Sequence, residues 1–242
     1  MRSENSWIWW DCRLGLAEEL GPKRMQIAIF MRGPFRPDVN SGLARARALA
    51  DEVRANGHEP VLFFATWTIE DRAALSTLAA QPDVGNMLVI EPPSLDYIHD
   101  VCGVHLLRDG RAVRNVFYQH YQARIGLQVI ASMGRFDYVI HSRPDVDIRL
   151  GVHFPHWLRD GAYSTIHGRA NGKAFINDQF GVATTVNMLA TWDYGTIENL
   201  GDLIRNAKIA EDVLERLFAD TGLEQRIVPL ELWQLDPRRH NA

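Results

Sequence analysis

The residue types with the clearest chemical potential follow an apolar segment near the middle of the chain. Residues 138–140 have the aromatic and β-branched composition of a buried strand, and Arg143, Pro144, Asp145 and Asp147 come just after them. Alternate residues of an extended chain project to one side, so the two carboxylates would lie together and would need a cation between them. A hard divalent ion with positions left open for phosphate meets that need. The alternative is a strand-end turn with two solvated acids.

A second group of candidates follows the first apolar strand, residues 25–30. Arg32, Gly33 and Arg36 belong to a glycine–proline turn that precedes a helical pattern, which is how open α/β sheets form a ligand crevice. The two arginines could bind phosphate in a forked geometry, or they are surface arginines. We expect both to converge with Arg143 on one anionic site, because both turns should open at strand carboxyl ends.

Two further segments place polar side chains beside apolar strands. Residues 60–65 are typical of a strand, and Thr66 and Trp67 follow at its carboxyl end. Asp178 lies in residues 177–179, which we expect to form a polar loop before a short apolar strand. Loops positioned by a rigid sheet carry functional residues disproportionately, although Asp178 could simply cap its own turn.

The elements that must position these residues alternate between strand and helix patterns. Strands are expected at residues 25–30, 60–65, 86–90, 138–140, 161–166 and 226–230, and helices at residues 41–56, 69–80, 115–133, 185–191 and 209–218. Asn40 or Ser41 is the expected N-cap of the first helix, and residues 94–113 are expected to be an irregular insertion. This alternation predicts an α/β fold with a mostly parallel central sheet flanked by helices.

Bulk composition narrows the function classes. The chain has 242 residues, of which 46% are hydrophobic and 23% charged, as in ordinary globular domains. A net charge of -4 gives no basic footprint for nucleic acid. Cys12 and Cys102 form neither a zinc motif nor a disulfide framework, so a reducing cytoplasm fits.

The domain organisation is expected to be simple. Residues 1–24 form an N-terminal extension, poorly ordered or loosely docked, whose Trp7, Trp9 and Trp10 could pack on the body or lie at a membrane interface. Residues 25–235 form one domain, and residues 236–242 form a basic tail.

The ordered set resembles bacterial capsule and lipopolysaccharide glycosyltransferase-like proteins of the nucleotide-diphospho-sugar transferase (GT-A) fold. The motifs that carry the likeness are Arg32-Gly33 with Arg36, Ala65-Thr66-Trp67, Gln119 in the long helix, the run from Phe136 to Asp147, and Asp178-Gln179-Phe180. The likeness covers roughly residues 25–230. His141 and Ser142 depart from it, because this strand end is more polar than the family pattern, and residues 1–24 have no counterpart.

The resemblance implies metal-assisted sugar transfer. Asp145 and Asp147 would hold Mn²⁺ or Mg²⁺, with Asp147 as the direct ligand, and the ion would stabilise the departing diphosphate as a Lewis acid. Asp178 would act as general base for an acceptor hydroxyl or contact the donor sugar, with His167 as a rival base. The residues that would contact phosphate, nucleotide or donor sugar are Arg32, Gly33, Arg36, Thr66, Trp67, Gln119 and Arg143.

The implied partners are a nucleotide-sugar donor and a glycan or glycolipid acceptor, with no nucleic acid. The expected location is the cytoplasm, and peripheral attachment at the inner membrane surface is left open.

Two alternative functions would use the same acidic residues. One is a metal-dependent phosphoesterase or nucleotide-sugar hydrolase, which would transfer to water. The other is a non-catalytic sugar-nucleotide or glycan-binding domain, which would show no turnover.

Overall fold

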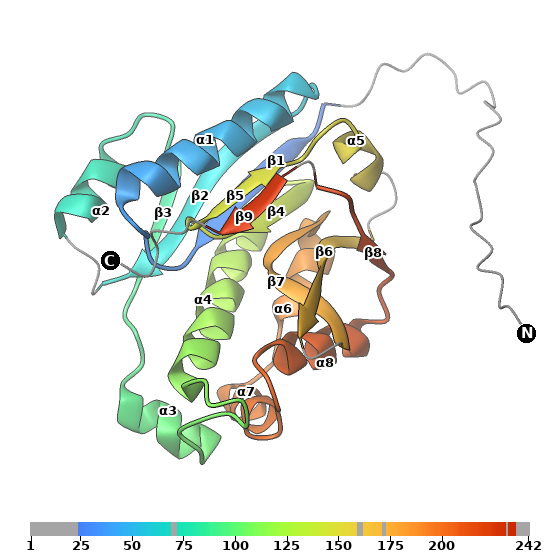
Figure 1. Cartoon of the computed structure of the whole chain (residues 1–242). Coiled ribbons are helices and arrows are strands. Elements are labelled where there is room, and N and C mark those ends of the chain that lie inside the picture. Colours follow the sequence, from blue (N-terminus) through green and yellow to red (C-terminus); the bar gives the residue numbers. More distant parts are fainter. Residues whose placement is uncertain (1–23, 69–71, 159–161, 171–172, 231, 236–242) are drawn as a thin grey trace, which may run out of the picture.

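The computed structural model describes residues 24–68, 72–158, 162–170, 173–230 and 232–235 (Figure 1). The strands are β1 (Gln26–Arg32), β2 (Glu59–Trp67), β3 (Asn86–Ile90), β4 (Tyr138–Ser142), β5 (Val146–Arg149), β6 (Tyr163–Ala170), β7 (Lys173–Thr184), β8 (Gln225–Ile227) and β9 (Leu232–Leu235). The helices are α1 (Val39–Ala55), α2 (Arg72–Ala79), α3 (Leu95–Cys102), α4 (Val113–Ser132), α5 (Phe154–Trp157), α6 (Thr185–Trp192), α7 (Ile197–Arg205) and α8 (Glu211–Thr221). The predicted tail, residues 236–242, and the predicted extension apart from Arg24 lie outside the described residues.

A seven-stranded sheet forms the centre of the domain, in the order β3-β2-β1-β4-β7-β6-β8. The pairs β3–β2, β2–β1, β1–β4 and β6–β8 are parallel, and β4–β7 and β6–β7 are antiparallel. The sheet is therefore mostly parallel, as predicted. Its direction changes between β4 and β7, so the parallel half ends beside the strand that carries Asp178.

The central strands are apolar because helices cover both of their faces. In β1 every residue after Gln26 is buried, and all of β4 is buried, which is typical of parallel strands between two helical layers. One face packs against α1, α2 and α5, and the other against α4, α6 and α8 (Figure 1). Two hydrophobic clusters thus lie on opposite sides of one sheet.

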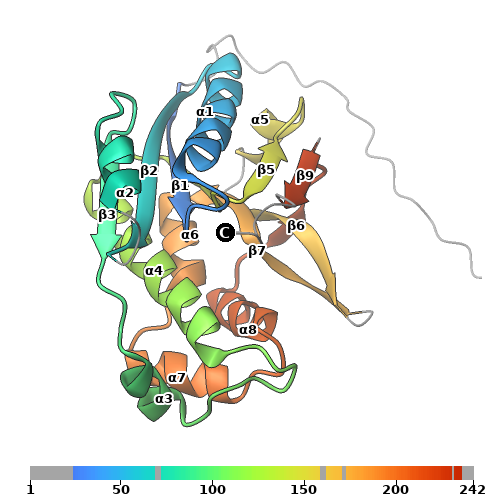
Figure 2. The same cartoon turned by 60° about the vertical axis from the view of Figure 1, so that its left-hand side comes forward.

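A third cluster lies at the end of α4 that is remote from α1. There α3 and α7 lie beside the start of α4 (Figure 2). These helices pack on one another through apolar side chains that include Ile98, Phe117 and Leu200. The sequence prediction of an irregular insertion at residues 94–113 was wrong, because it contains α3. Ser94 caps this helix by accepting a hydrogen bond from the Tyr97 amide, and Gly103 ends it in the left-handed conformation.

A two-stranded antiparallel sheet, β5–β9, lies beside the main sheet (Figures 1 and 2). It pairs Asp147 with Gln234 and Ile148 with Trp233, so the C-terminal strand is placed next to the Asp-x-Asp segment. Neither β9 nor α7 was among the predicted elements. Both are short, and β9 becomes a strand by pairing with a segment far away in the sequence.

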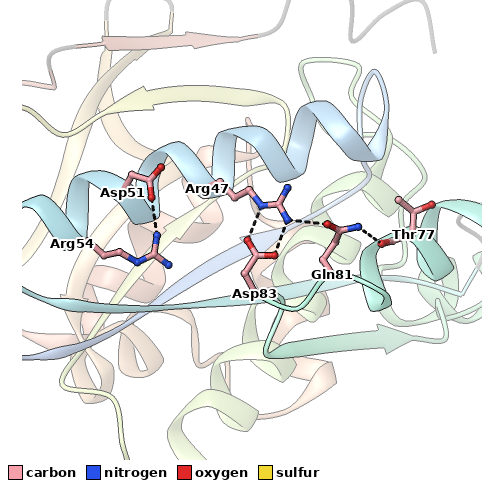
Figure 3. A network of polar contacts seen from close by, with 6 residues as sticks. All are labelled: Arg47, Asp51, Arg54, Thr77, Gln81 and Asp83. Carbon is pink, nitrogen blue, oxygen red and sulfur yellow. Dashed lines mark hydrogen bonds and ion pairs between the residues drawn. The ribbon is translucent and has the colours of Figure 1, made fainter.

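Surface contacts fix α1 to the connection between α2 and β3 (Figure 3). Arg47 donates two hydrogen bonds to the Asp83 carboxylate, at 2.6 and 2.7 Å, and one to Gln81. Gln81 in turn donates to the Thr77 carbonyl at the end of α2.

The α1 helix itself begins earlier than predicted: Asp38, rather than Asn40 or Ser41, is the N-cap and accepts from the Ser41 amide.

Candidate functional site

The turns after β1 and β4 open at the same edge of the sheet. The two strands are parallel neighbours in which Met31 pairs with Ser142, so Arg32 and Arg143 occupy adjacent strand ends. The positive charge of Arg143 is close enough to lower the pKa of Arg32. Arg32 and Arg143 therefore lie at the same edge of the sheet, as the sequence predicts.

Arg32 is the last residue of β1, and its guanidinium is buried. Its Nε donates to His141 Nε2 at 2.5 Å, and its Nη2 donates to the Asp178 carbonyl oxygen at 2.9 Å. The guanidinium also lies over the Trp192 ring, 4.8 Å from the ring centroid, in a cation–π arrangement. Burial lowers the pKa of Arg32 to about 10, against the raising influence of Asp178, so the group is still cationic at neutral pH.

Arg143 and Asp145 form a closed ion pair. Arg143 donates two hydrogen bonds to the two Asp145 oxygens, at 2.9 and 2.7 Å, which is the bidentate fork that guanidinium and carboxylate groups favour. The Asp145 side chain is only 2% exposed and that of Arg143 25% exposed. Burial, the largest single influence, would lower the pKa of Arg143, but the hydrogen bonds to Asp145 together with the charges of Asp145 and Asp178 raise it.

Asp147 has a different environment from Asp145. Its side chain is 44% exposed, and Oδ1 accepts a hydrogen bond of 2.8 Å from Arg45 Nε. Arg45 comes from α1 and also donates to the Pro144 carbonyl at 2.8 Å. The two acids therefore lie in separate ion pairs, one buried and one facing solvent. Asp145 precedes β5, which starts at Val146, so the alternation of side chains along an extended strand does not include Asp145.

One face of α1 holds the whole Asp-x-Asp segment in place. Gly42 allows Pro144 and Phe35 to approach the helix so closely that a side chain at position 42 would collide with both. One to three turns further on, Arg45 grips the Pro144 carbonyl and Glu52 accepts from the Leu150 amide at 2.6 Å. The helix thus fixes residues 144–150 at both ends.

Asp178 lies in a strand and not in the predicted loop, so that part of the prediction was wrong. It belongs to β7, at a register shift where Thr165 pairs with Gly181 but His167 pairs with Ile176. Ile166 alone therefore lies opposite residues 177–180, which form an irregular bulge of four residues. The Thr165 hydroxyl lies within hydrogen-bonding distance of the Asn177 and Phe180 carbonyls, at 3.3 and 2.7 Å. Bulges re-aim side chains next to active sites.

The bulge directs the Asp178 carboxylate toward α4. Its Oδ2 accepts a hydrogen bond of 2.5 Å from the Gln119 side-chain amide, while its main-chain oxygen holds Arg32. The Asp178 charge also raises the pKa of Arg143. Asp178, Gln119, Arg32 and Arg143 are therefore brought together from β7, α4, β1 and the turn after β4.

The remaining predicted residues lie nearby in different roles. Gly33 has a φ of +110°, which favours glycine, with open space where a side chain would start. Arg36 is exposed. Thr66 and Trp67 belong to β2 itself and are buried, so the Thr66 side chain does not reach the surface. Trp67 packs on Tyr118, with ring centroids 4.9 Å apart.

His167, the predicted rival base, is in β6, but its side chain lies outside the described part of the structure. His141 and Arg45 are site residues that the sequence did not assign. The polar strand end at His141 was a signal, because buried central strands rarely carry imidazoles. Arg45 gave none, since it is one of several arginines on an amphipathic helix.

Mn²⁺ or Mg²⁺ would need oxygen ligands from this cluster. In the described residues there is no group of three or more His, Cys, Asp and Glu side chains able to hold a metal, and both Asp145 oxygens are engaged by Arg143. Asp147 has an exposed carboxylate that touches Arg45 through one oxygen. Mg²⁺ commonly binds one or two carboxylates together with substrate phosphates and waters. The residues therefore fit a metal held by Asp147 and a phosphate ligand.

The described surface also has a pocket of about 470 Å³ between α7, α8 and the segment that joins α6 to α7, lined by residues such as Tyr194, Asn199 and Arg216. The predicted site residues are not among its lining residues. Part of its wall is structural: the Asp193 carboxylate is paired with Arg124 at 2.7 Å. The candidate site is therefore the cluster of Arg32, Arg143, Gln119 and Asp178, because its charged groups could bind an anion and accept a proton.

None of the helices in the described part of the chain is long and apolar enough to cross a bilayer.

Comparison with protein-family models gives no match, and comparison with curated proteins gives none either. Among solved structures, the chain is similar to the mannosyltransferase Ktr4p from S. cerevisiae in complex with GDP, with a TM-score of 0.52 and 10% sequence identity over 84% of this chain and 69% of that chain. Ktr4p alone gives a TM-score of 0.51 at 9% identity, over 81% and 66% of the two chains. A glycosyltransferase involved in the glycosylation of the major capsid of PBCV-1 gives 0.47 at 11% identity, over 84% and 80%.

At these identities the likeness concerns the fold. The mostly parallel sheet, the helical layers on both faces and the similarity to Ktr4p agree with one another. This chain has the nucleotide-diphospho-sugar transferase (GT-A) fold.

Proposed function

We propose that this protein is a glycosyltransferase that moves a sugar from a nucleotide-diphosphate donor to a hydroxyl group of a glycan or glycolipid. The observation that carries the proposal is the meeting of Arg32, Arg143 and Asp178 at the carboxyl ends of β1 and β4. Ligands of open α/β sheets bind at this edge, where the strand direction or order changes. Cationic groups suit a diphosphate, and a carboxylate suits a hydroxyl.

In the proposed reaction the sugar–phosphate bond breaks and the diphosphate leaves with its electrons, while the acceptor oxygen bonds to the sugar. A divalent ion, when bound, would stabilise the leaving diphosphate as a Lewis acid. Asp147 would hold that ion, with Asp145 keeping Arg143 in place. Arg32 and Arg143 would bind the phosphate oxygens, and Arg36 would reach the same anion from the turn.

Asp178 is proposed to act on the acceptor hydroxyl as a base or to bind the donor sugar. Its carboxylate is aimed by Gln119, and a carboxylate held in this way can take the proton of an attacking hydroxyl or bind a sugar hydroxyl. Gln119 is then better described as an aligning group than as the direct contact with nucleotide or sugar that the family resemblance implies. Trp67, packed on Tyr118, supports the α4 segment that carries Gln119.

The test is a thermal-shift screen of UDP-, GDP-, CMP- and dTDP-sugars with and without Mn²⁺, because a ligand that binds the native state raises its apparent stability. GDP deserves inclusion because the Ktr4p structure of this fold contains it. A metal-dependent shift with one nucleotide sugar, followed by transfer to a glycan acceptor, would support the proposal. Transfer to water alone would favour a hydrolase, and binding without turnover would favour a binding domain.

A further inference from the structure

The Arg32 guanidinium differs from those of Arg143 and Arg45 in what it bonds to. Arg143 and Arg45 each pair with a carboxylate, Asp145 and Asp147 respectively. In the described residues, the hydrogen bonds of Arg32 go to the His141 imidazole and to the Asp178 main-chain carbonyl. Both acceptors are uncharged. Arg32 is therefore held in place without having its charge cancelled by a direct ion pair.

The chemistry of the imidazole is set by this bond. His141 is buried in the middle of the sheet, and its Nε2 accepts from Arg32 Nε, so the proton of the neutral ring must be on Nδ1. Burial and the Arg32 charge hold the pKa of His141 well below its usual value, which keeps Nε2 available as an acceptor. Its ring lies edge-on to Trp192, with centroids 5.0 Å apart.

Trp192 completes the enclosure from α6. The indole contacts His141 on one side and carries the Arg32 guanidinium at 4.8 Å. Three elements, β4, α6 and β7, thus fix one buried cation at the edge where the diphosphate is proposed to bind. A carboxylate in the place of His141 would fix Arg32 equally well but would neutralise the charge that a phosphate needs.

We infer that His141 is a positioning residue whose uncharged imidazole aims Arg32 at the donor diphosphate while leaving the arginine charge free to bind it. This inference rests on the proposed function, since it needs an anionic donor. It assigns His141 a role in orientation and not in the transfer of protons. We expect Arg32 to contribute more to diphosphate affinity than Arg143 or Arg45, because each of these two already pairs with a carboxylate.

The test compares His141→Leu, which removes the acceptor, with His141→Gln, whose side-chain oxygen can reach the position of Nε2. His120→Leu is the matched control, because His120 is equally buried, packs on Trp192 at 5.1 Å, and has no hydrogen bond to a described residue through either ring nitrogen. Binding of pyrophosphate and of GDP to the full chain is measured by calorimetry. We expect His141→Leu to weaken both by about 10- to 100-fold, and the other two variants to stay within about threefold of wild type.

A ligand-free measurement separates the positioning role from the proposed function. The Arg32 Nε–H proton, observed by NMR, should exchange slowly with water in wild type and His141→Gln and rapidly in His141→Leu. Equal protection of the Arg32 Nε–H in wild type, His141→Gln and His141→Leu, or unchanged pyrophosphate affinity in a folded His141→Leu protein, would overturn the inference. If the NMR signal behaves as expected but neither pyrophosphate nor any nucleotide sugar binds wild type, the positioning stands and the proposed function fails.

Discussion

The Gln119 side-chain amide donates a 2.5 Å hydrogen bond to the Asp178 carboxylate across 59 positions of sequence. The bond joins α4, which covers one face of the sheet, to the bulge in β7. It fixes the direction of a nearly buried carboxylate whose main-chain oxygen also holds Arg32. A substitution at either residue should therefore change the orientation of the other side chain.

Asp178→Asn tests the proposed base. The asparagine oxygen can still accept from Gln119, so the fold and donor binding should survive, but an amide cannot take a proton. Turnover should fall by about 10²–10⁴, measured as sugar transfer once the donor is known. Weakened donor binding would assign Asp178 to the sugar instead. Full transfer activity in a folded variant would remove it from the site.

Gln119→Leu tests the alignment of Asp178. The leucine fills similar space but donates nothing, so the carboxylate loses its fixed direction. We expect turnover to fall by roughly tenfold, less than in Asp178→Asn, because a misaligned base is still a base. Gln128→Leu, an exposed change on the same helix, is the control. A Gln119→Leu enzyme with wild-type turnover would show that alignment is unnecessary.

Asp147→Asn tests the metal site. The charge of the exposed carboxylate disappears while its size is kept, so Mn²⁺-dependent nucleotide-sugar binding should be lost and the thermal unfolding temperature without ligand should change little. Asp51→Asn serves as control, because Asp51 is also an exposed acid paired with an arginine of α1. Donor and Mn²⁺ binding at wild-type strength would show that Asp147 is not a metal ligand.

Acid should destabilise the protein through its buried histidines. Burial, reinforced by the Arg32 charge, lowers the pKa of His120 from 6.5 to about 3. The unfolded state then binds one more proton than the folded state between these values, so stability is full above pH about 6.5 and falls as the pH drops toward 3. The slope is about 1.4 kcal/mol per pH unit for each such histidine.

Chemical denaturation of wild type and His120→Leu at several pH values between 4.5 and 7.5 checks this expectation. Unfolded His120→Leu has no imidazole at position 120 to take up a proton, so the stability of the variant should depend less steeply on pH than that of wild type. Parallel curves for the two proteins would mean that His120 is protonated equally in both states.

The contacts between Arg47 and Asp83 should matter little for stability and function (Figure 3). The two side chains are 42% and 33% exposed, and partly exposed ion pairs contribute less than about 1 kcal/mol. A double-mutant cycle with Arg47→Ala and Asp83→Ala should give a coupling energy in that range, with donor binding unchanged. Coupling well above it would show that the connection between α2 and β3 is held more firmly than exposed pairs are.

The local sequence predicts much of the fold because the central strands are short apolar runs and most helices have strong periodic patterns. The stripe Leu43, Ala46, Ala50 and Val53 is buried as its spacing predicts, and the long helix differs from its predicted bounds by only one or two residues at each end. The insertion at residues 94–113 was misjudged because α3 is short and its apolar face, with Ile98 and Cys102, has meaning only against α4 and α7.

The sequence by itself determined that Arg32, Arg143 and the two acids follow apolar strands, because strand ends are a local property. Only the tertiary structure decided which charges meet. Asp145 and Asp147, neighbours in sequence, are drawn to different arginines because α1 brings Arg45 to one of them. Arg32, His141, Trp192 and Asp178 are far apart along the chain and come together because β1 pairs with β4, β4 with β7, and α6 packs beneath them. Strand order and helix packing are non-local, so no residue pattern could reveal that partnership.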